Sequence, residues 1–387
     1  MKPARFDLLP TATWPRLRTL LDGHAPGGDV INMTIGEPKH KFPDWVVPAL
    51  MDAVAGFNSY PDNNGTEQLR GSICEFLKRR YQVSMKADSQ VMVLNGTREG
   101  LFNAVVALCP TGSKILIPNP FYQVYAVAAM AVGAQPVYLP TSVETGFLPN
   151  LDELTSSELN DASAFFLCSP SNPQGAIADA DYWTRLLGLA ETYDFKIFAD
   201  ECYSEIYRNA PPPGALEIAA KIGADPERVV AFHSLSKRSN LPGLRSGFVA
   251  SGPKNISQIK QLRAYAGCPV AGPIQDVSAK VWADEDHVVA NRQLYCDKFE
   301  VSDRIFDGID AYNSPEAGFF LWLPVEDDQI ATIKLWTEKG VRVLPGSYLG
   351  HTANEQNPGS GYVRVALVAP KEETQRGLTI IRDCLYK

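Results

Sequence analysis

The chain has 387 residues, of which 45% are hydrophobic and 21% charged, a composition typical of a globular protein. Its 36 basic and 44 acidic residues give a net charge of −8 without a long run of one sign, which argues against nucleic acid or an anionic membrane as the main partner. A chain of this length exceeds one comfortable core, so two domains are expected.

The cysteines and histidines indicate neither a disulfide framework nor a metal site. The seven cysteines are dispersed, and no two have Cys-x-x-Cys spacing. Several stand inside apolar stretches, so we expect buried free thiols in a reducing cytoplasm. The five histidines lack metal-ligand spacing, which argues against a metalloenzyme. No apolar run is long enough to span a bilayer, and the N-terminus lacks the apolar core of a secretory signal.

In chain order, short apolar strands alternate with helical stretches through the middle of the sequence. Strands are predicted at 91–94, 114–117, 136–139, 164–168, 196–199, 229–232 and 247–250, with helices at 98–108, 121–132 and 180–193 among others. This alternation predicts an α/β fold. We expect a large domain, residues 46–280, with a mostly parallel sheet covered by helices on both faces.

After about residue 280 the pattern changes to that of a smaller α+β domain. Helices are predicted at 284–306, 327–339 and 371–385, and strands at 319–323, 341–344 and 362–367. We expect residues 281–387 to form this second domain together with residues 1–45, which are rich in proline and glycine and wrap onto it. Ligands of parallel sheets bind where strand C-termini meet loops, so the candidate site residues are sought there.

Three loops after predicted strands carry candidate ligands. Gly96 permits close backbone approach, and the amides of Thr97 and Arg98 open the next helix, an arrangement that binds phosphate. An ordinary glycine turn with a capping threonine would have the same sequence. Tyr122 can stack on a flat ring. Asn172, in a turn fixed by two prolines, can donate its amide to a phenolate oxygen.

Two acids and a tyrosine follow the strand at 196–199. Asp200 and Glu201 are adjacent, so on an extended strand end one faces a cofactor and the other faces packing or solvent. A pyridinium ring needs a carboxylate to keep its nitrogen protonated, and Asp200 with Tyr203 can meet the ring nitrogen and the phenolic oxygen. A charged strand cap is the alternative interpretation.

A lysine with two serines and an arginine follows the strand at 229–232. Lys237, held at a desolvated strand end, can react as a neutral amine and form a Schiff base with a carbonyl such as that of pyridoxal phosphate. Ser234, Ser236 and Arg245 then supply donors for the phosphate. Farther along, Arg364 stands inside an apolar strand, where it can grip a substrate carboxylate or form a structural ion pair.

Taken together, these motifs resemble the class I aminotransferases, the fold-type I family of pyridoxal-phosphate enzymes, over nearly the whole chain. The most specific part is the ordered set N-P-x-G (172–175), D-x-x-Y (200–203) and S-x-S-K (234–237), followed eight residues after the lysine by Arg245. The resemblance implies pyridoxal 5'-phosphate as cofactor, an amino acid and a 2-oxo acid as substrates, and a homodimer with shared active sites.

The same resemblance implies a role for each candidate residue. Lys237 matches the lysine that binds the cofactor, acts as general base on the substrate Cα and returns the proton, while Asp200 matches the partner of the pyridine nitrogen. Tyr203 and Asn172 match the ligands of the phenolic oxygen, and Tyr122 matches the stacking aromatic. The phosphate cup is matched by Ser234, Ser236, Arg245, Gly96, Thr97 and Arg98.

Three further matches concern the substrate and the neighbouring subunit. Arg364 matches the clamp on the substrate α-carboxylate, and Gly36, in IGEP, matches the N-terminal segment that closes over substrate. Tyr60 matches a tyrosine that such dimers lend to the phosphate of the neighbouring subunit.

A closer resemblance is to the succinyldiaminopimelate aminotransferase subgroup of lysine and peptidoglycan biosynthesis. It rests on IGEPKH, NGTREGLF, PNPFYQVY, DECYSEIY, SLSKRSNLPGLRSGFVA, VLPGSYLG and VRVALVAP. Two departures are Gln174, where many relatives have threonine, and Asp62-Asn63-Asn64 before Gly65, where small or basic residues are commoner. The implied reaction joins succinyldiaminopimelate to the 2-oxoglutarate/glutamate pair. The alternatives are an aminotransferase of aspartate, aromatic or other amino acids, a β-lyase or decarboxylase on the same fold, and a non-enzymatic ligand-binding protein.

Overall fold

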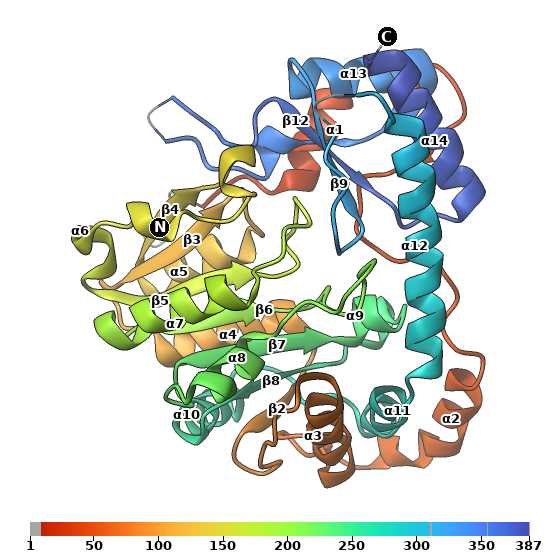
Figure 1. Ribbon diagram of the computed structural model, residues 1–387. Helices are drawn as coiled ribbons and strands as arrows, with labels where there is room; N and C mark the ends of the chain where they lie inside the picture. The colour runs from red at the N-terminus through yellow and green to blue at the C-terminus, as the bar shows by residue number, and fades with distance from the viewer. Residues whose placement is uncertain (1–8, 310–311, 354, 387) are drawn as a thin grey trace.

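The computed structural model describes residues 9–309, 312–353 and 355–386 (Figure 1). Residues 1–8, 310–311, 354 and 387, which belong to the predicted second domain, lie outside the described residues. All seven strands predicted between residues 91 and 250 are present in one sheet, in the order β2-β8-β7-β6-β5-β3-β4. Their bounds are Val91–Leu94 (β2), Lys114–Asn119 (β3), Gln135–Pro140 (β4), Ala162–Cys168 (β5), Lys196–Asp200 (β6), Val229–Ser234 (β7) and Gly247–Ser251 (β8).

The sheet is mostly parallel, as predicted. Strands β3 to β7 pair in parallel, and only β8 runs antiparallel to its two neighbours, β7 and β2. The C-terminal ends of β6 and β7 therefore lie side by side at one edge of the sheet, with Asp200 paired to Phe232 in the register. This places the loops that carry Asp200 and Lys237 next to each other.

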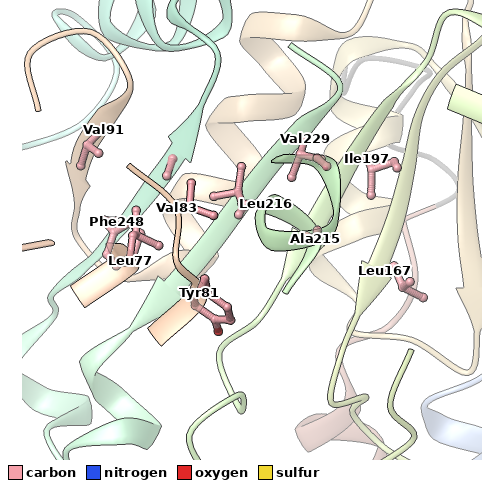
Figure 2. Close-up of a cluster of buried hydrophobic side chains, with 14 of the residues drawn as sticks. Leu77, Tyr81, Val83, Val91, Leu167, Ile197, Ala215, Leu216, Val229 and Phe248 are labelled. Carbon is pink, nitrogen blue, oxygen red and sulfur yellow. The ribbon is translucent and has the colours of Figure 1, made fainter. Parts of the chain in front are cut away.

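Helices cover both faces of this sheet because the strands carry apolar side chains on each face. One face packs against α4 (Thr97–Leu108), α5 (Val124–Val132) and α10 (Pro253–Arg263). The other packs against α3 (Glu67–Tyr81), α7 (Ala180–Tyr193), α8 (Ala215–Ile222) and α11 (Gly272–Ala283). Figure 2 shows part of this second face, with Val91, Leu167, Ile197, Val229 and Phe248 from the strands, Leu77 and Tyr81 from α3, and Ala215 and Leu216 from α8. A sheet buried on both faces confirms the predicted α/β class.

The C-terminal part forms a second hydrophobic core around a small antiparallel sheet, β11-β12-β9. Its elements are α12 (Asp286–Phe306), β9 (Phe320–Pro324), α13 (Asp328–Lys339), β10 (Val341–Arg342), β11 (Leu344–Pro345), β12 (Tyr362–Ala366) and α14 (Lys371–Leu385). The predicted single strand at 341–344 is wrong in one respect. It is two strands, because β10 pairs with the N-terminal segment and β11 pairs with β12.

The N-terminal segment packs on this second core. Strand β1 (Ile31–Asn32) pairs in parallel with β10, and the backbone amide of Gly27 donates to the carbonyl of Trp336 at 3.0 Å. Helix α1 (Thr13–Leu21) also packs there, against α13. The domain boundaries themselves, 45/46 and 280/281, stay a prediction. In Figure 1 the long helix α12 runs from α11, beside the large sheet, to the small sheet above it.

The remaining elements are short. They are α2 (Val46–Ala53), α6 (Ser156–Leu159), α9 (Leu235–Arg238) and the 3-10 turns η2 (Val54–Asn58), η3 (Val143–Thr145), η4 (Leu151–Glu153), η5 (Pro242–Leu244) and η6 (Gly346–Tyr348). In the part of the chain that the structure describes, no helix is long and apolar enough to cross a membrane.

Candidate active site

A cavity of about 720 Å³ lies where the ends of the large sheet meet the N-terminal segment and the small sheet. Every candidate residue from the sequence lines this cavity except Gly96 and Tyr60. The lining candidates are Gly36, Thr97, Arg98, Tyr122, Asn172, Asp200, Tyr203, Ser234, Ser236, Lys237, Arg245 and Arg364. Residues far apart in the chain thus converge on one site.

Lys237 lies on α9, the single helical turn that follows β7. Ser234 caps this turn, and its Oγ accepts a hydrogen bond from the amide of Ser236 at 3.1 Å. The Nζ of Lys237 donates to the carbonyl of Gly36 in the N-terminal segment. Burial lowers the pKa of Lys237 from 10.5 to about 8, because an ammonium group loses hydration there. A neutral, nucleophilic amine is therefore accessible near neutral pH.

Asp200 ends β6 and is 4% exposed. The Tyr125 hydroxyl donates to its Oδ2 at 2.7 Å, and the amide of Cys202 donates to Oδ1 at 3.4 Å. Burial raises the pKa of Asp200, while the Cys202 and Tyr125 hydrogen bonds and the charge of Lys237 lower it. A buried carboxylate of this kind gains most from a cationic partner that arrives with a ligand.

The neighbouring acid, Glu201, faces away from the cavity, which confirms the predicted alternation. Its Oε1 accepts a hydrogen bond from the amide of Ala215 at 2.8 Å, at the start of α8. Burial raises the pKa of Glu201 to about 7. Of the two adjacent carboxyls, only Asp200 lines the cavity.

Donors for an anion gather around Arg245 and the start of α4. The guanidinium of Arg245 donates to the carbonyls of Pro242 at 2.9 Å and Asn95 at 3.1 Å. Gly96 has φ +80°, and a Cβ there would collide with the Arg245 guanidinium. Gly96 does not line the cavity, but because it has no Cβ it leaves the space that the Arg245 guanidinium occupies. The Oγ of Ser234 lies 3.0 Å from that of Ser236. With the N-terminus of the 12-residue α4, these groups suit a phosphate.

Tyr122 forms one wall of the cavity, and its ring packs edge-on against Tyr125 with centroids 5.8 Å apart. The Nε of Arg98 donates to the Tyr122 hydroxyl at 2.6 Å, which fixes the ring from one side. Tyr203 is buried and packs edge-on against Phe319 and Phe320. Burial raises the pKa of both Tyr122 and Tyr203, so both phenols stay neutral donors.

Arg364 reaches the cavity from β12 and is 5% exposed. Its Nη1 donates to Asn172 Oδ1 and its Nη2 donates to the carbonyl of Thr34, both at 2.8 Å. Its Nε is buried without a hydrogen-bond partner, and no carboxylate of the described residues pairs with it. Burial lowers the pKa of Arg364 to about 10, so a substrate carboxylate would restore the charge balance. The alternative, a structural ion pair, would need a carboxylate beside Arg364, and none is found among the described residues.

Tyr60 lies apart from this group and is fully exposed, at 101% of its reference area. It follows η2 on the large-domain side. Its predicted role on a neighbouring subunit stays a prediction.

Sequence reasoning missed several groups around the cavity. Tyr125 was missed, although its hydroxyl donates to Asp200. Cys202 was also missed, although its Sγ lies 3.1 Å from the Oγ1 of Thr97. Thr13 and Trp14, at the start of α1, also line the cavity. The sequence signal that could have found Tyr125 is its position three residues after Tyr122 in PFYQVY. The residues around α1 carry no local sequence sign of a site.

The residues present fit pyridoxal phosphate. Arg245, the serines and the start of α4 suit its phosphate, Asp200 suits its ring nitrogen, and Lys237 suits its aldehyde. Two structural observations favour this fit. Gly96 leaves space for the Arg245 guanidinium, and the buried Nε of Arg364 has no hydrogen-bond partner.

Comparison with known proteins gives a consistent result. The model of the aminotransferase class I and II family matches residues 28–381. An LL-diaminopimelate aminotransferase from Syntrophobacter fumaroxidans is 29% identical over 400 residues, covering 100% of this chain and 99% of its own length. The LL-diaminopimelate aminotransferase 2 of a Nostoc species is 29% identical over 371 residues, covering 93% of this chain and 92% of its own.

Two solved structures have nearly the same fold. An aminotransferase from Neisseria meningitidis has a TM-score of 0.94 and 35% identity, covering 98% of this chain and 99% of its own. The aminotransferase AspB from Helicobacter pylori has a TM-score of 0.91 and 34% identity, covering 96% of this chain and 98% of its own. Neither curated relative is named for the succinylated donor that the sequence motifs favoured; both are named for LL-diaminopimelate.

Proposed function

The chain belongs to the class I and II aminotransferases, enzymes whose usual cofactor is pyridoxal phosphate, and on that premise we propose that Lys237 is its reactive amine. The observation that carries the proposal is the convergence of Lys237, Asp200 and Arg364 on one cavity. An amine with a lowered pKa, a buried carboxylate and an arginine with a free Nε are the groups that amino transfer requires.

Bound pyridoxal phosphate supplies an aldehyde that condenses with amines and a protonated ring that accepts the electron pair left when the Cα–H bond breaks. The chain's own residues do the rest. Asp200 would pair with the ring nitrogen. Burial raises the pKa of Asp200, and the hydrogen bonds from Tyr125 and Cys202 oppose that rise. Lys237, once an incoming amine replaces it, accepts the Cα proton at Nζ as general base.

Arg364 orients the substrate for that proton transfer. Its guanidinium is held by Asn172 and by the carbonyl of Thr34, so its direction is set before a substrate carboxylate binds. The Nζ of Lys237 is itself anchored to Gly36, two residues after Thr34. The same N-terminal segment therefore positions both the base and the carboxylate clamp.

The finer proposal is a donor of the diaminopimelate class, with 2-oxoglutarate and glutamate as the second substrate pair. The subgroup motifs in the sequence and the names of the two curated relatives support this class. A free distal ammonium and a succinylated distal nitrogen make different demands on the cavity. Apart from Asp200, Glu37 is the acidic residue among the lining residues, and it suits a distal ammonium.

A homodimer is part of the proposal. The surface around α2 and η2 exposes Val47, Met51, Val54, Phe57 and Tyr60, apolar side chains that a partner surface could cover. A second copy that covers this surface would bury Tyr60 of the first copy near the active site of the second. Sedimentation velocity should give a dimer. Tyr60→Phe should weaken cofactor binding while the protein remains a dimer.

The test is a half-reaction followed by absorbance on the purified enzyme with pyridoxal phosphate. Each donor is added alone: LL-diaminopimelate, N-succinyl-diaminopimelate, glutamate, aspartate and aromatic amino acids. Conversion of the cofactor to its amino form by a diaminopimelate donor, reversed by 2-oxoglutarate, supports the proposal. Release of ammonia with no such conversion would point to a lyase and overturn it. An unchanged cofactor spectrum in Lys237→Ala would refute the assignment of the amine.

A further inference from the structure

The three residues after Lys237 are all bound to the corner between α11 and α12. We call residues 281–291, the end of α11 and the start of α12, the α11–α12 corner. Arg238, which is 2% exposed, donates from Nη1 to the carbonyl of Val281 at 3.0 Å. Its Nη2 donates to the carbonyl of Asp284 at 3.2 Å and to Glu285 Oε1 at 2.7 Å. The turn that carries the reactive amine is thus held by side chains as well as by its backbone.

Ser239 continues this contact, and its geometry excludes a separate catalytic role. Its Oγ lies 2.8 Å from Nε2 of His287, whose Nδ1 contacts the Asp284 carboxylate. A serine, a histidine and an aspartate in this order resemble a hydrolase triad. However, Ser239 is 0% exposed and lines neither described cavity, so no substrate can reach it. The three residues hold the turn in place.

Asn291, on α12, contacts the backbone of Lys237 itself. Its Nδ2 donates to the carbonyls of Lys237 and Arg238, each at 3.3 Å. Its Oδ1 accepts from Asn240 Nδ2 at 2.9 Å and lies 3.4 Å from Nδ1 of His40. Asn291 is 4% exposed, so these bonds form away from water.

The backbone of the turn cannot supply these two bonds itself. A carbonyl in a helix accepts from the amide four residues later, and the amide of Leu241 instead donates to Leu235 at 3.4 Å. The residue four positions after Arg238 is Pro242, which has no amide hydrogen. The carbonyls of Lys237 and Arg238 would therefore stay unsatisfied without Asn291.

Helix α12 connects this contact to the other half of the site. Beyond Asn291 it packs into the second core through Tyr295 and Phe299, and the Nζ of Lys298 donates to the carbonyl of Leu367 at 2.7 Å. Leu367 directly follows β12, the strand that carries Arg364. One helix therefore contacts the backbone of the reactive lysine and the end of the strand that bears the carboxylate clamp.

We propose that Asn291 is a positioning residue for amino transfer, which holds the carbonyls of Lys237 and Arg238 and so sets the direction in which Nζ leaves the turn. The inference rests on the proposed role of Lys237. It is distinct from a general contribution to stability, because the cap acts on the backbone of the reacting residue itself.

The test compares Asn291→Ala and the nearly isosteric Asn291→Asp with Asn255→Ala. Asn255 is a matched control: it is 2% exposed and its Nδ2 also donates to a carbonyl, that of Glu227 at 2.8 Å, but α10 carries it away from the site. The first readout is hydrogen exchange of the amides of residues 236–241 in the cofactor-free protein. The second is kcat and KM of the enzyme with pyridoxal phosphate.

Both Asn291 variants should exchange these amides about tenfold faster or more. Both should lose about 10- to 100-fold in kcat, with KM for the donor within about threefold, because a displaced base affects the proton transfer more than substrate binding. Asn255→Ala should lower thermal stability and change neither readout. Unchanged exchange at 236–241 in both Asn291 variants, or an equal loss of kcat in Asn255→Ala, would overturn the inference. If Lys237 were not the reactive amine, exchange would still rise while the kcat effect disappeared, which separates this failure from that of the proposed function.

Discussion

The Tyr125 hydroxyl donates a hydrogen bond to the Asp200 carboxylate at 2.7 Å, between two side chains that are both nearly inaccessible to water. Tyr125 stacks flat on Phe166, with ring centroids 4.3 Å apart at 9°, so its hydroxyl has little freedom to turn away. This bond opposes the rise in the pKa of Asp200 that burial causes. Tyr125 thereby helps Asp200 to stay ionised for its partner.

Tyr125→Phe should therefore weaken cofactor binding. Loss of the bond raises the pKa of Asp200 further, and a buried hydrogen bond to a charged group contributes about 1.5–3 kcal/mol, so we expect at least about a tenfold rise in Kd for pyridoxal phosphate. Tryptophan fluorescence titration of the cofactor-free protein measures it. The control is Tyr182→Phe, which removes a hydrogen bond to the Pro149 carbonyl outside the cavity. Equal affinities in both variants would show that Tyr125 does not tune Asp200.

Gly96→Ala should reduce cofactor affinity through Arg245. The added Cβ would collide with the guanidinium, and φ of +80° adds backbone strain. Gly112→Ala is the matched control, because Gly112 has φ +83° and nothing within 4 Å of its Cβ position. Both variants should lose about 1 kcal/mol of stability from φ alone. Only Gly96→Ala should raise Kd for pyridoxal phosphate, by about tenfold or more, in the same fluorescence titration. A similar Kd for the two variants would contradict the support of Arg245 by Gly96.

Arg364→Lys should raise KM for both the amino donor and the oxo acid by about 100-fold, because a lysine cannot reproduce the fork that binds a carboxylate with two parallel bonds. Kd for pyridoxal phosphate should stay within about twofold. Arg342→Lys is the control, from strand β10 of the same part of the chain, where the guanidinium packs over Trp336 at 4.4 Å outside the cavity. Steady-state kinetics with both substrates measures the effect, and a change in kcat alone would assign Arg364 another role.

Lys237→Met should stabilise the cofactor-free protein at neutral pH. The folded-state pKa of about 8 lies below the unfolded value of 10.5, so between these values the unfolded chain binds more protons. The cost of burying the ammonium is fully present below about pH 8 and disappears as the pH rises towards 10.5. At pH 7 we expect Lys237→Met to gain about 3 kcal/mol in the free energy of unfolding, measured by urea titration.

The gain should shrink steadily when the titration is repeated at pH 8, 9 and 10. Lys254→Met, at an exposed position on α10, should leave stability unchanged across this range. A gain for Lys237→Met that is the same at every pH would mean that the lysine is not destabilised by burial of its charge.

Much of the fold and of the candidate site was readable from local sequence, because Asp200 ends an apolar strand and Lys237 and Asn172 lie in the loops just after one. A polar side chain in that position lies at the strand's C-terminal edge whatever the rest of the chain does. The strand order and the split between β10 and β11 were not readable in this way. The split depends on the pairing of β10 with residues 31–32, about 310 positions earlier, and the strand order depends on contacts between segments far apart in the chain. Neither leaves a local trace in the sequence.

The supporting groups were also hidden, for a different reason. Asn291 stands 54 residues after Lys237 in a charged helix, and nothing in its neighbours distinguishes it from a surface asparagine. Tyr125 has the sequence of an ordinary core residue in an apolar helix. Residues that contact the reacting groups carry unusual chemistry, whereas residues that orient them are common types placed by tertiary packing.

The hydrogen bond from Arg364 to the carbonyl of Thr34 joins residues 330 positions apart. During synthesis from the N-terminus, the segment that carries Thr34 leaves the ribosome long before Arg364 exists. The loops proposed to bind the phosphate, and Lys237, belong to the large sheet of residues 91–251, which can form in that interval. A nascent chain therefore contains the residues proposed to bind a phosphate and the proposed reactive amine before Arg364, the proposed carboxylate clamp, is made. Loss of a C-terminal piece that includes β12 would remove Arg364 together with Val363 and Val365 of the second core, whereas every residue proposed to hold the cofactor would remain in the chain.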